Sequence, residues 1–495
     1  MQSQKKLTAA RALSALAAGA LLALGVAGGA AAAPSDTTID PKQTGSITIH
    51  KFEKPPATGA AGNGKIQDTT GLTPLPDVTF SIAQVDPSIY DLTTNAGWSA
   101  LASLTPGAAA AGTKLEKGPV TTAADGTASL ANLPIGVYLV TETGVPAGVT
   151  PGAPFLITLP MTDPDVQNAW MYNVHVYPKN SKVGGGTKTV DEEGATKVGD
   201  VLTWTILGDI PNSEVIDGYR IVDPLDDRLT YQSTAVSLDN GVALLPTDYT
   251  VTVTDAPSAK VTVTFTAAGL LKLAANNTAH VKVVIKTIIN TAGEIPNSAI
   301  IYPNLPSFDI KPGEPGGPVV TPEIPVAKYG NVTIEKVSSK SASTKLKGAV
   351  FQIYTSEADA KSGDTAKAIT LGDPAVSSWT TDDSGRLTIS GLRQSAWYNG
   401  GPVADTDAGF QYYWIVETKA PAGYSLLAEP VRVTVGDLDE VVDFTVEDSP
   451  SNGGFQLPFT GSVMSAGLFY GGGAVILLGA ALLIIRARRK VATEA

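Results

Sequence analysis

The chain has 495 residues, a formal net charge of −12 at pH 7 and no cysteine. Because it has no cysteine, no disulfide can stabilise it, and its negative charge excludes a typical nucleic-acid-binding protein, which needs a basic surface to neutralise phosphates. Its 50 glycines and 34 prolines, together with many threonines and valines, favour an all-β protein with many turns.

The sequence lacks the motifs of common enzymes and metal sites. The three histidines (His50, His175 and His280) are far apart, and no HExxH motif or Cys/His metal spacing occurs. A GxSxG motif, a P-loop and a GxGxxG in its expected context are also absent. We therefore predict that the protein binds no cofactor, holds no metal and is not an enzyme.

The first 33 residues are typical of a secretory signal peptide. Lys5, Lys6 and Arg11 precede an apolar stretch at 13–26, and a run of small residues then ends at Ala33. This layout predicts export and cleavage near Ala33, because the apolar run is short for a transmembrane helix and has a cleavable tail. The length of the remaining exported part indicates three domains.

Two junctions divide the exported part. A triple glycine at 184–186 and a proline-rich stretch at 303–325 are typical of linkers or of connections at the edge of a sheet. Short alternating strands bounded by turn residues fill the rest, which is the sequence form of an immunoglobulin-like β-sandwich. The predicted domains are 34–182, 183–322 and 323–452.

The first and third domains are copies of one plan. Residues 45–51 match 330–336, and both segments end in a lysine. Further matches pair 78–82 with 349–353, Thr121, Thr122 and Gly126 with Thr380, Thr381 and Gly385, and 140–148 with 416–423. We also expect helices near 95–104 and 270–275, and a β-hairpin formed by 249–254 and 260–265.

Strand periodicity directs several polar groups towards the apolar face. Residues two apart on a strand share a face, so Lys336 lies on the same face as Val332 and Ile334. Burying an isolated charge is costly, and burial favours the neutral amine of a lysine and the protonated form of a carboxylic acid. The same rule places five more groups on apolar faces: Lys51, Glu142, Asn180, Glu417 and Asp448.

These groups are suited to forming an amide cross-link between strands. A neutral lysine amine can attack a neighbouring Asn or Asp carbonyl that a protonated acid polarises, once and without turnover. For the third domain we predict that Lys336 is bonded to Asp448 with the assistance of Glu417, and Asn452 is the alternative partner. In a chain without cysteine such a bond would replace a disulfide and would resist reduction.

The middle domain offers a second set of this kind. Lys188, Asn297 and Asp223 each share strand parity with apolar neighbours. We predict that Lys188 is bonded to Asn297 and that Asp223 assists. The alternative, which is the commoner situation for a single lysine at a strand end, is a side chain that extends its charge into water.

Residues 457–495 contain three consecutive signals. A short pentapeptide precedes an uncharged apolar run at 463–485, which as a helix would rise ~34 Å and cross a membrane. The basic cluster behind it is expected to stay in the cytoplasm. The alternative is an ordinary tail-anchored protein with a chance pentapeptide. The pentapeptide is Leu457, Pro458, Phe459, Thr460 and Gly461, and the basic residues are Arg486, Arg488, Arg489 and Lys490.

Three motifs carry a resemblance to a known family. Residues 170–180 read WMYNVHVYPKN, which is similar to the pilin motif WxxxVxVYPK of the backbone (shaft) pilins of Gram-positive sortase-assembled pili, in particular actinobacterial fimbrial subunits. Residues 413–424, YWIVETKAPAGY, are similar to the E-box YxLxETxAPxGY, with Ile415 in the usual Leu position. LPFTG resembles an LPxTG sorting signal, with Phe459 where Leu or Glu is common. The resemblance covers essentially the whole chain, and it implies three tandem sandwiches of the collagen-adhesin B type.

The resemblance implies a covalent bond between subunits. In this family a class C sortase attacks the Thr carbonyl of the sorting signal, and the pilin-motif lysine of another subunit resolves the acyl-enzyme. Carried over, Thr460 of one chain becomes joined to Lys179 of the next. By strand parity Lys179 lies opposite the inward-facing Asn180, so we expect its amine to be exposed. The resemblance also implies internal Lys–Asn/Asp bonds, and the first-domain set of Lys51, Glu142 and Asn180 is expected to be latent until polymerisation orders it.

We therefore expect the major structural subunit of a covalent pilus that supports adhesion. The implied location is secreted, on the cell wall, after transient anchoring in the membrane by the C-terminal helix. The implied partners are the class C sortase, identical subunits, tip and basal pilins, the housekeeping sortase with peptidoglycan, and an unidentified host receptor, but no nucleic acid. The alternative is a monomeric wall-anchored adhesin or a minor (basal or tip) pilin. Lys179 discriminates, because an adhesin or a tip subunit needs no acceptor amine.

Overall fold

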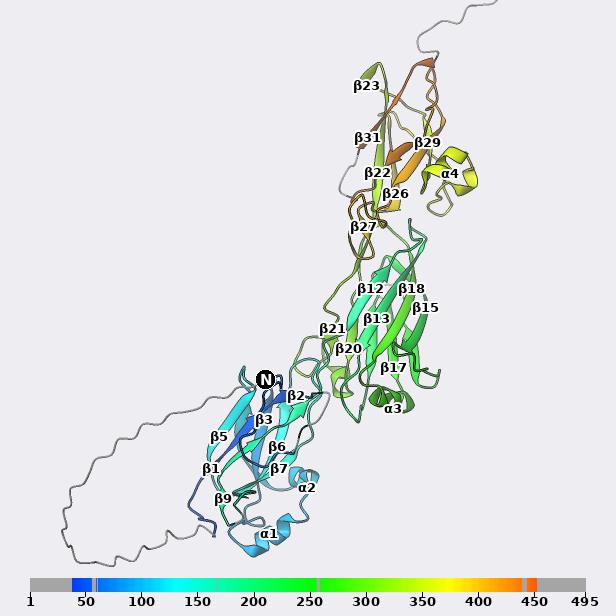
Figure 1. The fold of residues 1–495 in the computed structure, drawn as a ribbon. Helices are drawn as coiled ribbons and strands as arrows, with labels where there is room; N and C mark the ends of the chain where they lie inside the picture. The colour runs from blue at the N-terminus through cyan, green and yellow to red at the C-terminus, as the bar shows by residue number, and fades with distance from the viewer. Residues whose placement is uncertain are drawn as a thin grey trace, which may run out of the picture.

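Three β-sandwich modules follow one another along the chain and lie end to end (Figure 1). The structure, a computed structural model, describes residues 38–55, 59, 61–166, 168–255, 259–438 and 443–451. The predicted signal peptide, the sorting signal with Thr460, the apolar run behind it and Asn452 lie outside these residues. No helix in the described part is long and apolar enough to cross a membrane.

The first module packs a three-stranded sheet, β10-β1-β5, against a four-stranded sheet, β4-β3-β6-β7. Alternating side chains of β1, such as Ile47 and Ile49, meet Phe80, Tyr138 and Val140 in its core. Two short helices are inserted between β3 and β4, the first of which confirms the helix expected near 95–104. The elements are β1 (Gly45–His50), β2 (Phe52–Glu53), β3 (Thr79–Val85), α1 (Asn95–Leu101), α2 (Pro106–Ala111), β4 (Lys114–Thr121), β5 (Thr127–Leu133), β6 (Gly136–Gly144), β7 (Phe155–Leu159), β8 (Met161–Thr162), β9 (Trp170–Met171), β10 (Asn173–Val176) and β11 (Lys179–Asn180).

The third module repeats this arrangement. Its strand β22 lies between β26 and β31, as β1 lies between β5 and β10, and in both modules the last strand runs parallel to the first. The facing sheet, β25-β24-β29-β30, corresponds to β4-β3-β6-β7. The repeat read from the sequence is therefore a repeat in space. The elements are β22 (Val326–Ser338), β23 (Ser341–Lys345), β24 (Val350–Tyr354), α4 (Glu357–Ser362), η2 (Thr365–Lys367), β25 (Trp379–Thr380), β26 (Arg386–Arg393), β27 (Trp397–Tyr398), β28 (Gly401–Pro402), β29 (Tyr413–Lys419), β30 (Val431–Val433) and β31 (Asp443–Asp448).

The middle module has a different topology. Its sheets, β12-β13-β18-β15 and β16-β17-β14-β20-β21, contain only antiparallel pairs among the described strands. The hairpin of β16 and β17 and the helix α3 lie where the sequence predicted them. The elements are β12 (Thr187–Asp191), β13 (Val201–Asp209), β14 (Arg220–Pro224), β15 (Leu229–Leu238), β16 (Tyr249–Val253), β17 (Lys260–Phe265), α3 (Ala267–Ala275), β18 (His280–Ile289), β19 (Gly293–Pro296), β20 (Ile300–Tyr302), η1 (Pro306–Asp309) and β21 (Val319–Val320).

The proline-rich stretch 303–325 is a connection at the edge of a sheet and not a free linker. Its strand β21 pairs with β20 of the middle module, and the amide of Gly316 donates a hydrogen bond to the carbonyl of Val145 in the first module. The long strand β22 then begins against β19 of the middle module and continues into the third module. The boundaries expected at 182/183 and 322/323 stay a prediction.

The β-sandwich class expected from the sequence is confirmed in all three modules. The finer expectation, three immunoglobulin-like sandwiches of the collagen-adhesin B type, stays a prediction; the middle module pairs its strands in a different order from the other two. Each module has its own buried apolar cluster, and the three clusters include Ile49, Trp204 and Ile334. In every module a lysine lies beside this cluster: Lys51, Lys188 and Lys336 are among the largest fully buried side chains of the chain.

Candidate functional site

The first module brings Lys51, Glu142 and Asn180 into direct contact. Lys51 follows β1, Glu142 lies on β6 and Asn180 on β11, so three separate strand segments supply the group. The Lys51 Nζ donates to Glu142 Oε1 at 2.7 Å and to Asn180 Oδ1 at 2.5 Å. Asn180 Nδ2 donates in turn to Glu142 Oε2 at 2.6 Å, and the amide of Gly152 donates to the same oxygen at 2.8 Å. The acid therefore contacts both the amine and the amide.

The environment of Lys51 favours its neutral form. The side chain is fully buried, and its Nζ lies 5.9 Å from the centre of the Phe80 ring. This burial lowers the pKa of Lys51, the charge of Glu142 opposes the shift, and the positive charge of Lys179 adds to it. A neutral amine held against an amide carbonyl is the arrangement needed for nucleophilic attack.

The third module contains the equivalent group with an acid in place of the amide. Lys336 Nζ lies 2.5 Å from Asp448 Oδ1 and 3.3 Å from Glu417 Oε1, and all three side chains are buried. Burial raises the pKa of Glu417, as does the nearby Asp448, while Lys336 and the amide of Leu427 oppose the shift. Leu427 donates to Glu417 Oε2 at 3.0 Å, ten residues after the acid, as Gly152 does after Glu142. Asp448 is thus the partner that the structure places beside Lys336.

The middle module places Lys188 of β12 beside Asp223 of β14. Lys188 Nζ lies 2.7 Å from Asp223 Oδ2, and it donates to the carbonyl of Ser298 at 3.1 Å. Burial lowers the pKa of Lys188 to about 8, against the attraction of Asp223. Burial also raises the pKa of Asp223, although Lys188 and the neighbouring Asn297 offset part of the rise.

Asn297 completes the middle group. It is 1% exposed, and neither its Oδ1 nor its Nδ2 makes a hydrogen bond of good geometry. Burying an amide without such partners makes folding less favourable. Conversion of this amide into a bond with Lys188 would remove that unfavourable contribution. The nine side chains that the alternation of strand residues directed inward are therefore all buried, as one group of three in each module.

Lys179 departs from the sequence expectation, because it is partly buried and not exposed. Its strand β11 is paired with β2, and Lys179 lies opposite Phe52 in this pair. The amide of Thr150 donates to the carbonyl of Ser181, the residue that follows β11. Asn180 is buried, as predicted. Parity correctly separated the two side chains, but it could not show how closely neighbouring segments cover the outer one.

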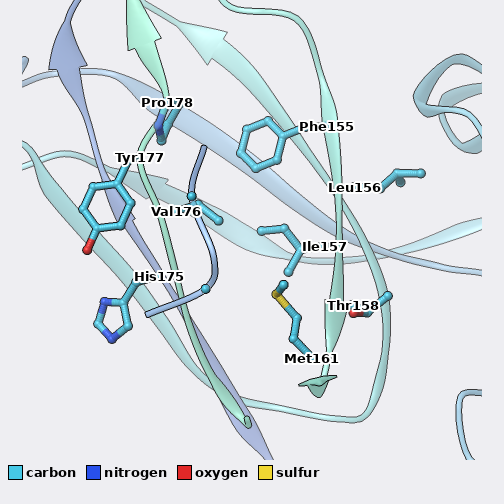
Figure 2. A pocket seen from close by; sticks show the side chains of 11 residues that line it. Phe155, Leu156, Ile157, Thr158, Met161, His175, Val176, Tyr177 and Pro178 are labelled. Carbon is cyan, nitrogen blue, oxygen red and sulfur yellow. The ribbon is translucent and has the colours of Figure 1, made fainter. Parts of the chain in front are cut away.

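A groove of about 420 Å³ runs along the strand that precedes Lys179. Figure 2 shows its walls, with Phe155 and Ile157 of β7 and Met161 on one side and His175, Tyr177 and Pro178 of the pilin-motif segment on the other. Gly62 and Gly64 also line it. Since Pro178 is the residue directly before Lys179, the groove lies beside the segment that carries the candidate acceptor amine, although Lys179 does not itself line it.

Sequence reasoning missed two polar groupings. His50 and His175, which are 125 residues apart, share a hydrogen bond of 3.0 Å between Nε2 and Nδ1. Glu192 is 1% exposed at the junction of the middle and third modules, and burial raises its pKa to about 7 against the opposing effects of Arg393 and of the Asn399 and Gly400 amides. No local motif marks either grouping. Across the described residues, no cluster of three or more His, Asp or Glu is arranged to hold a metal ion.

Comparisons with known proteins agree with the arrangement of the modules. Residues 42–181 match a family model described as the N-terminal domain of Gram-positive pilin subunit D1, and residues 330–450 match one described as a prealbumin-like fold domain. The chain is 34% identical to the fimbrial subunit type 1 of Actinomyces viscosus, with 96% of both chains covered. It belongs to the Gram-positive fimbrial subunits.

Two further similarities extend over most of the chain. The fimbrial subunit type 2 of Actinomyces naeslundii is 30% identical over 96% of both chains. The solved structure of the full-length major pilin SpaD of Corynebacterium diphtheriae superimposes with a TM-score of 0.64 at 28% identity, covering 84% of this chain and 99% of SpaD. This fimbrial subunit is thus a structural pilin and not an enzyme.

Proposed function

We propose that this pilin is a covalently polymerised shaft subunit whose modules are each closed by one internal isopeptide bond. The observation that carries the proposal is the recurrence of one constellation in three buried places: a lysine, a carboxylic acid and an Asn or Asp side chain. Two of the places are related by the internal repeat, but the middle one has its own topology. Recurrence on two topologies supports selection for the chemistry and not only for the fold.

In the first module the reaction balances as the exchange of one amide for another. Lys51 Nζ passes a proton to Glu142 and attacks Asn180 Cγ, forming an N–C bond. The Cγ–Nδ2 bond then breaks, and ammonia leaves with a proton that Glu142 Oε2, already bound to Nδ2, returns. The middle module would react in the same way through Lys188, Asn297 and Asp223.

In the third module the leaving group differs. Lys336 Nζ attacks Asp448 Cγ and forms an N–C bond, and one Cγ–O bond of Asp448 breaks. The departing oxygen takes two protons, one that the lysine amine loses and one that Glu417 donates, and leaves as water. This requires Asp448 and Glu417 to hold a proton between them while Lys336 is neutral. Burial raises the pKa of Glu417, which favours the protonated acid that this step uses.

Polymerisation would use the two ends of the molecule. The nucleophile of a class C sortase would take the carbonyl of Thr460 and release Gly461, and Lys179 Nζ of the next subunit would displace the enzyme to form an amide. The groove of Figure 2, which is lined by residues 175–178 immediately before Lys179, supports this segment as the acceptor because it offers an incoming chain a place to bind beside it. The subunit would be displayed on the cell surface, joined to tip and basal pilins and finally to peptidoglycan by the housekeeping sortase.

The test compares two lysines that are three residues apart in the sequence. Lys179→Arg keeps the charge but presents a non-nucleophilic guanidinium, whereas Lys182→Arg changes an exposed lysine that pairs with Glu53. On cells expressing the complete pilus system, the first variant should abolish the high-molecular-weight ladder in boiling detergent, and the second should keep it. A ladder that persists in Lys179→Arg would refute the acceptor assignment.

A further inference from the structure

We infer that the turns Thr122–Gly126 and Thr381–Gly385 are positioning elements that fix the backbone of the cross-linking lysines Lys51 and Lys336. The inference rests on the proposed isopeptide function and deepens it. These turns are part of the internal repeat, yet neither contacts the reacting atoms. Their contacts instead converge on the peptide units on both sides of each lysine Cα.

The glycine at the end of each turn holds the lysine amide. Lys51 N donates to the carbonyl of Gly126 at 2.8 Å, and Lys336 N donates to that of Gly385 at 2.7 Å. Both glycines have a positive φ, 76° and 73°. A Cβ on Gly126 would lie 2.4 Å from the carbonyl oxygen of Lys51, and one on Gly385 would lie 2.6 Å from that of Lys336. Only glycine therefore allows this close approach to the lysine backbone.

The threonine at the start of each turn holds the lysine carbonyl through one intermediate residue. In the third module Lys336 O accepts from the amide of Leu346 at 2.9 Å. The carbonyl of Leu346 accepts from Thr381 Oγ1 at 2.8 Å, and this hydroxyl also accepts from the amide of Ala349 at 3.0 Å. Because Thr381 is 2% exposed, water does not compete for these bonds.

The first module repeats the same chain of bonds. Lys51 O accepts from Leu75 N at 3.0 Å, and Leu75 O accepts from Thr122 Oγ1 at 2.9 Å. Thr122 Oγ1 accepts from Val78 N at 3.0 Å, and its residue is 3% exposed. Two copies of the sequence plan have thus kept the same buried hydroxyl, the same glycine and the same bonds around the lysine.

The middle module holds the backbone of its lysine through a single antiparallel ladder, whereas in the other two modules the antiparallel ladder ends just before the lysine. Lys188 lies within β12, opposite Ile206 of β13, in a continuous antiparallel ladder. Lys51 follows the last residue of β1, and the pairing of β22 with β26 ends at Glu335, one residue before Lys336. Without the turns, both lysines would have their backbone held on fewer sides, and the amine would lie less accurately against its partner.

The experiment follows the formation of the Lys336–Asp448 bond in the full-length chain. The chain is made in a cell-free reaction, stopped in denaturant at set times and digested, and the peptide bearing the cross-link is quantified by mass spectrometry. Thr381→Val should slow the bond roughly tenfold to hundredfold, because small misplacements of reacting groups have effects of this size. Thr381→Ser, which restores the hydroxyl, should stay within a few-fold of the unchanged chain. The bond in the middle module serves as the internal reference.

Two controls separate positioning from stability. Thr380→Val changes the adjacent exposed threonine, and Val433→Ala opens a cavity in the third-module core away from the turn. If Thr381→Val reacts as fast as Thr380→Val, or is slowed only as much as Val433→Ala when both variants are equally destabilised, the inference is wrong. If the unchanged chain forms no Lys336–Asp448 bond, the proposed cross-link itself fails.

Discussion

Lys336 and Asp448 meet across a parallel pair of strands although they are not opposite each other in register. Lys336 is registered with Val446 and Asp448 with Ser338, yet Nζ and Oδ1 are 2.5 Å apart. The long lysine side chain spans the offset, and both groups point into the core, where they are 0% and 1% exposed. A bond here would tie the first strand of the module to its last, which is the connection that tension along the chain would open first.

Replacing Asp448 tests the chemistry of the third module. Asp448→Asn should still give the bond, with a mass loss of ~17 Da as ammonia in place of ~18 Da as water. Asp448→Ala should give no bond and remove one of the two carboxyl groups beside the buried Lys336. Removing one partner of a buried ion pair costs roughly 3–5 kcal/mol. Peptide mass mapping and thermal unfolding provide the two measurements. Both reactions give the same Lys–Asp amide, so the cross-linked peptide should have one mass in the two chains although their uncross-linked forms differ by about 1 Da; cross-linked peptides of different mass would contradict this chemistry.

Replacing the acid of the first module tests its role in proton transfer. Glu142→Gln keeps the size of the side chain, but it has one acceptor oxygen in place of two and cannot accept a proton at physiological pH. We expect it to slow or prevent the Lys51–Asn180 bond, by roughly 10²–10⁴-fold, while the bonds of the other two modules form normally. Peptide mapping of the exported chain measures all three bonds in one sample. Normal first-module bonding in this variant would remove Glu142 from the mechanism.

The middle module makes a prediction about pH. In Asn297→Ala no bond can form, so Lys188 remains an amine whose folded pKa of about 8 lies below its ordinary 10.5. The unfolded chain then binds more protons between these values, and the variant should gain up to about 3 kcal/mol of stability as pH rises from 8 towards 10. The unchanged chain, with Lys188 in an amide, should show no such gain. Chemical unfolding followed at several pH values distinguishes the two, and an equal gain in both chains would argue against the bond.

Glu192 gives the opposite dependence at the junction of the middle and third modules. Its folded pKa of about 7 lies above its ordinary 4.5, so the ionised form is disfavoured by folding. The free energy of unfolding should therefore fall as the pH rises from about 4.5 through 7, because the carboxyl ionises more readily in the unfolded chain. Above pH 7 the total loss should be about 3 kcal/mol. Glu192→Gln should therefore be more stable than the unchanged chain at pH 8 and nearly equal to it at pH 5. A substitution effect independent of pH would show that the carboxyl does not titrate at this junction.

The sequence predicted much of the site because strand parity is a local property. The alternation of Val332, Ile334 and Lys336 is enough to direct the lysine inward, and the repeat with 45–51 extends this to the first module. The hairpin of β16 and β17 and the helix α3 were predicted for the same reason, since their patterns are local.

Features that depend on contacts between distant segments could not be predicted in this way. Glu192 lies on a short segment after β12, and nothing nearby in sequence shows that the loop containing Asn399 covers it. The partial burial of Lys179 depends on Phe52 and on residues 149–150, and the antiparallel topology of the middle module depends on which of several similar strands pair. When a distant segment buries a residue, the sequence around that residue shows no periodic pattern that reveals it.

The central claim, that subunits are joined through Lys179 and Thr460, is tested most directly on fibres taken from the cell surface. The fibres are boiled in detergent, the high-molecular-weight fraction is digested, and its peptides are sequenced by mass spectrometry. The account predicts a branched peptide in which the carbonyl of Thr460 is bonded to Nζ of Lys179. Fibres that dissolve into single subunits, or a ladder in which Thr460 is bonded to any other amine, would contradict it.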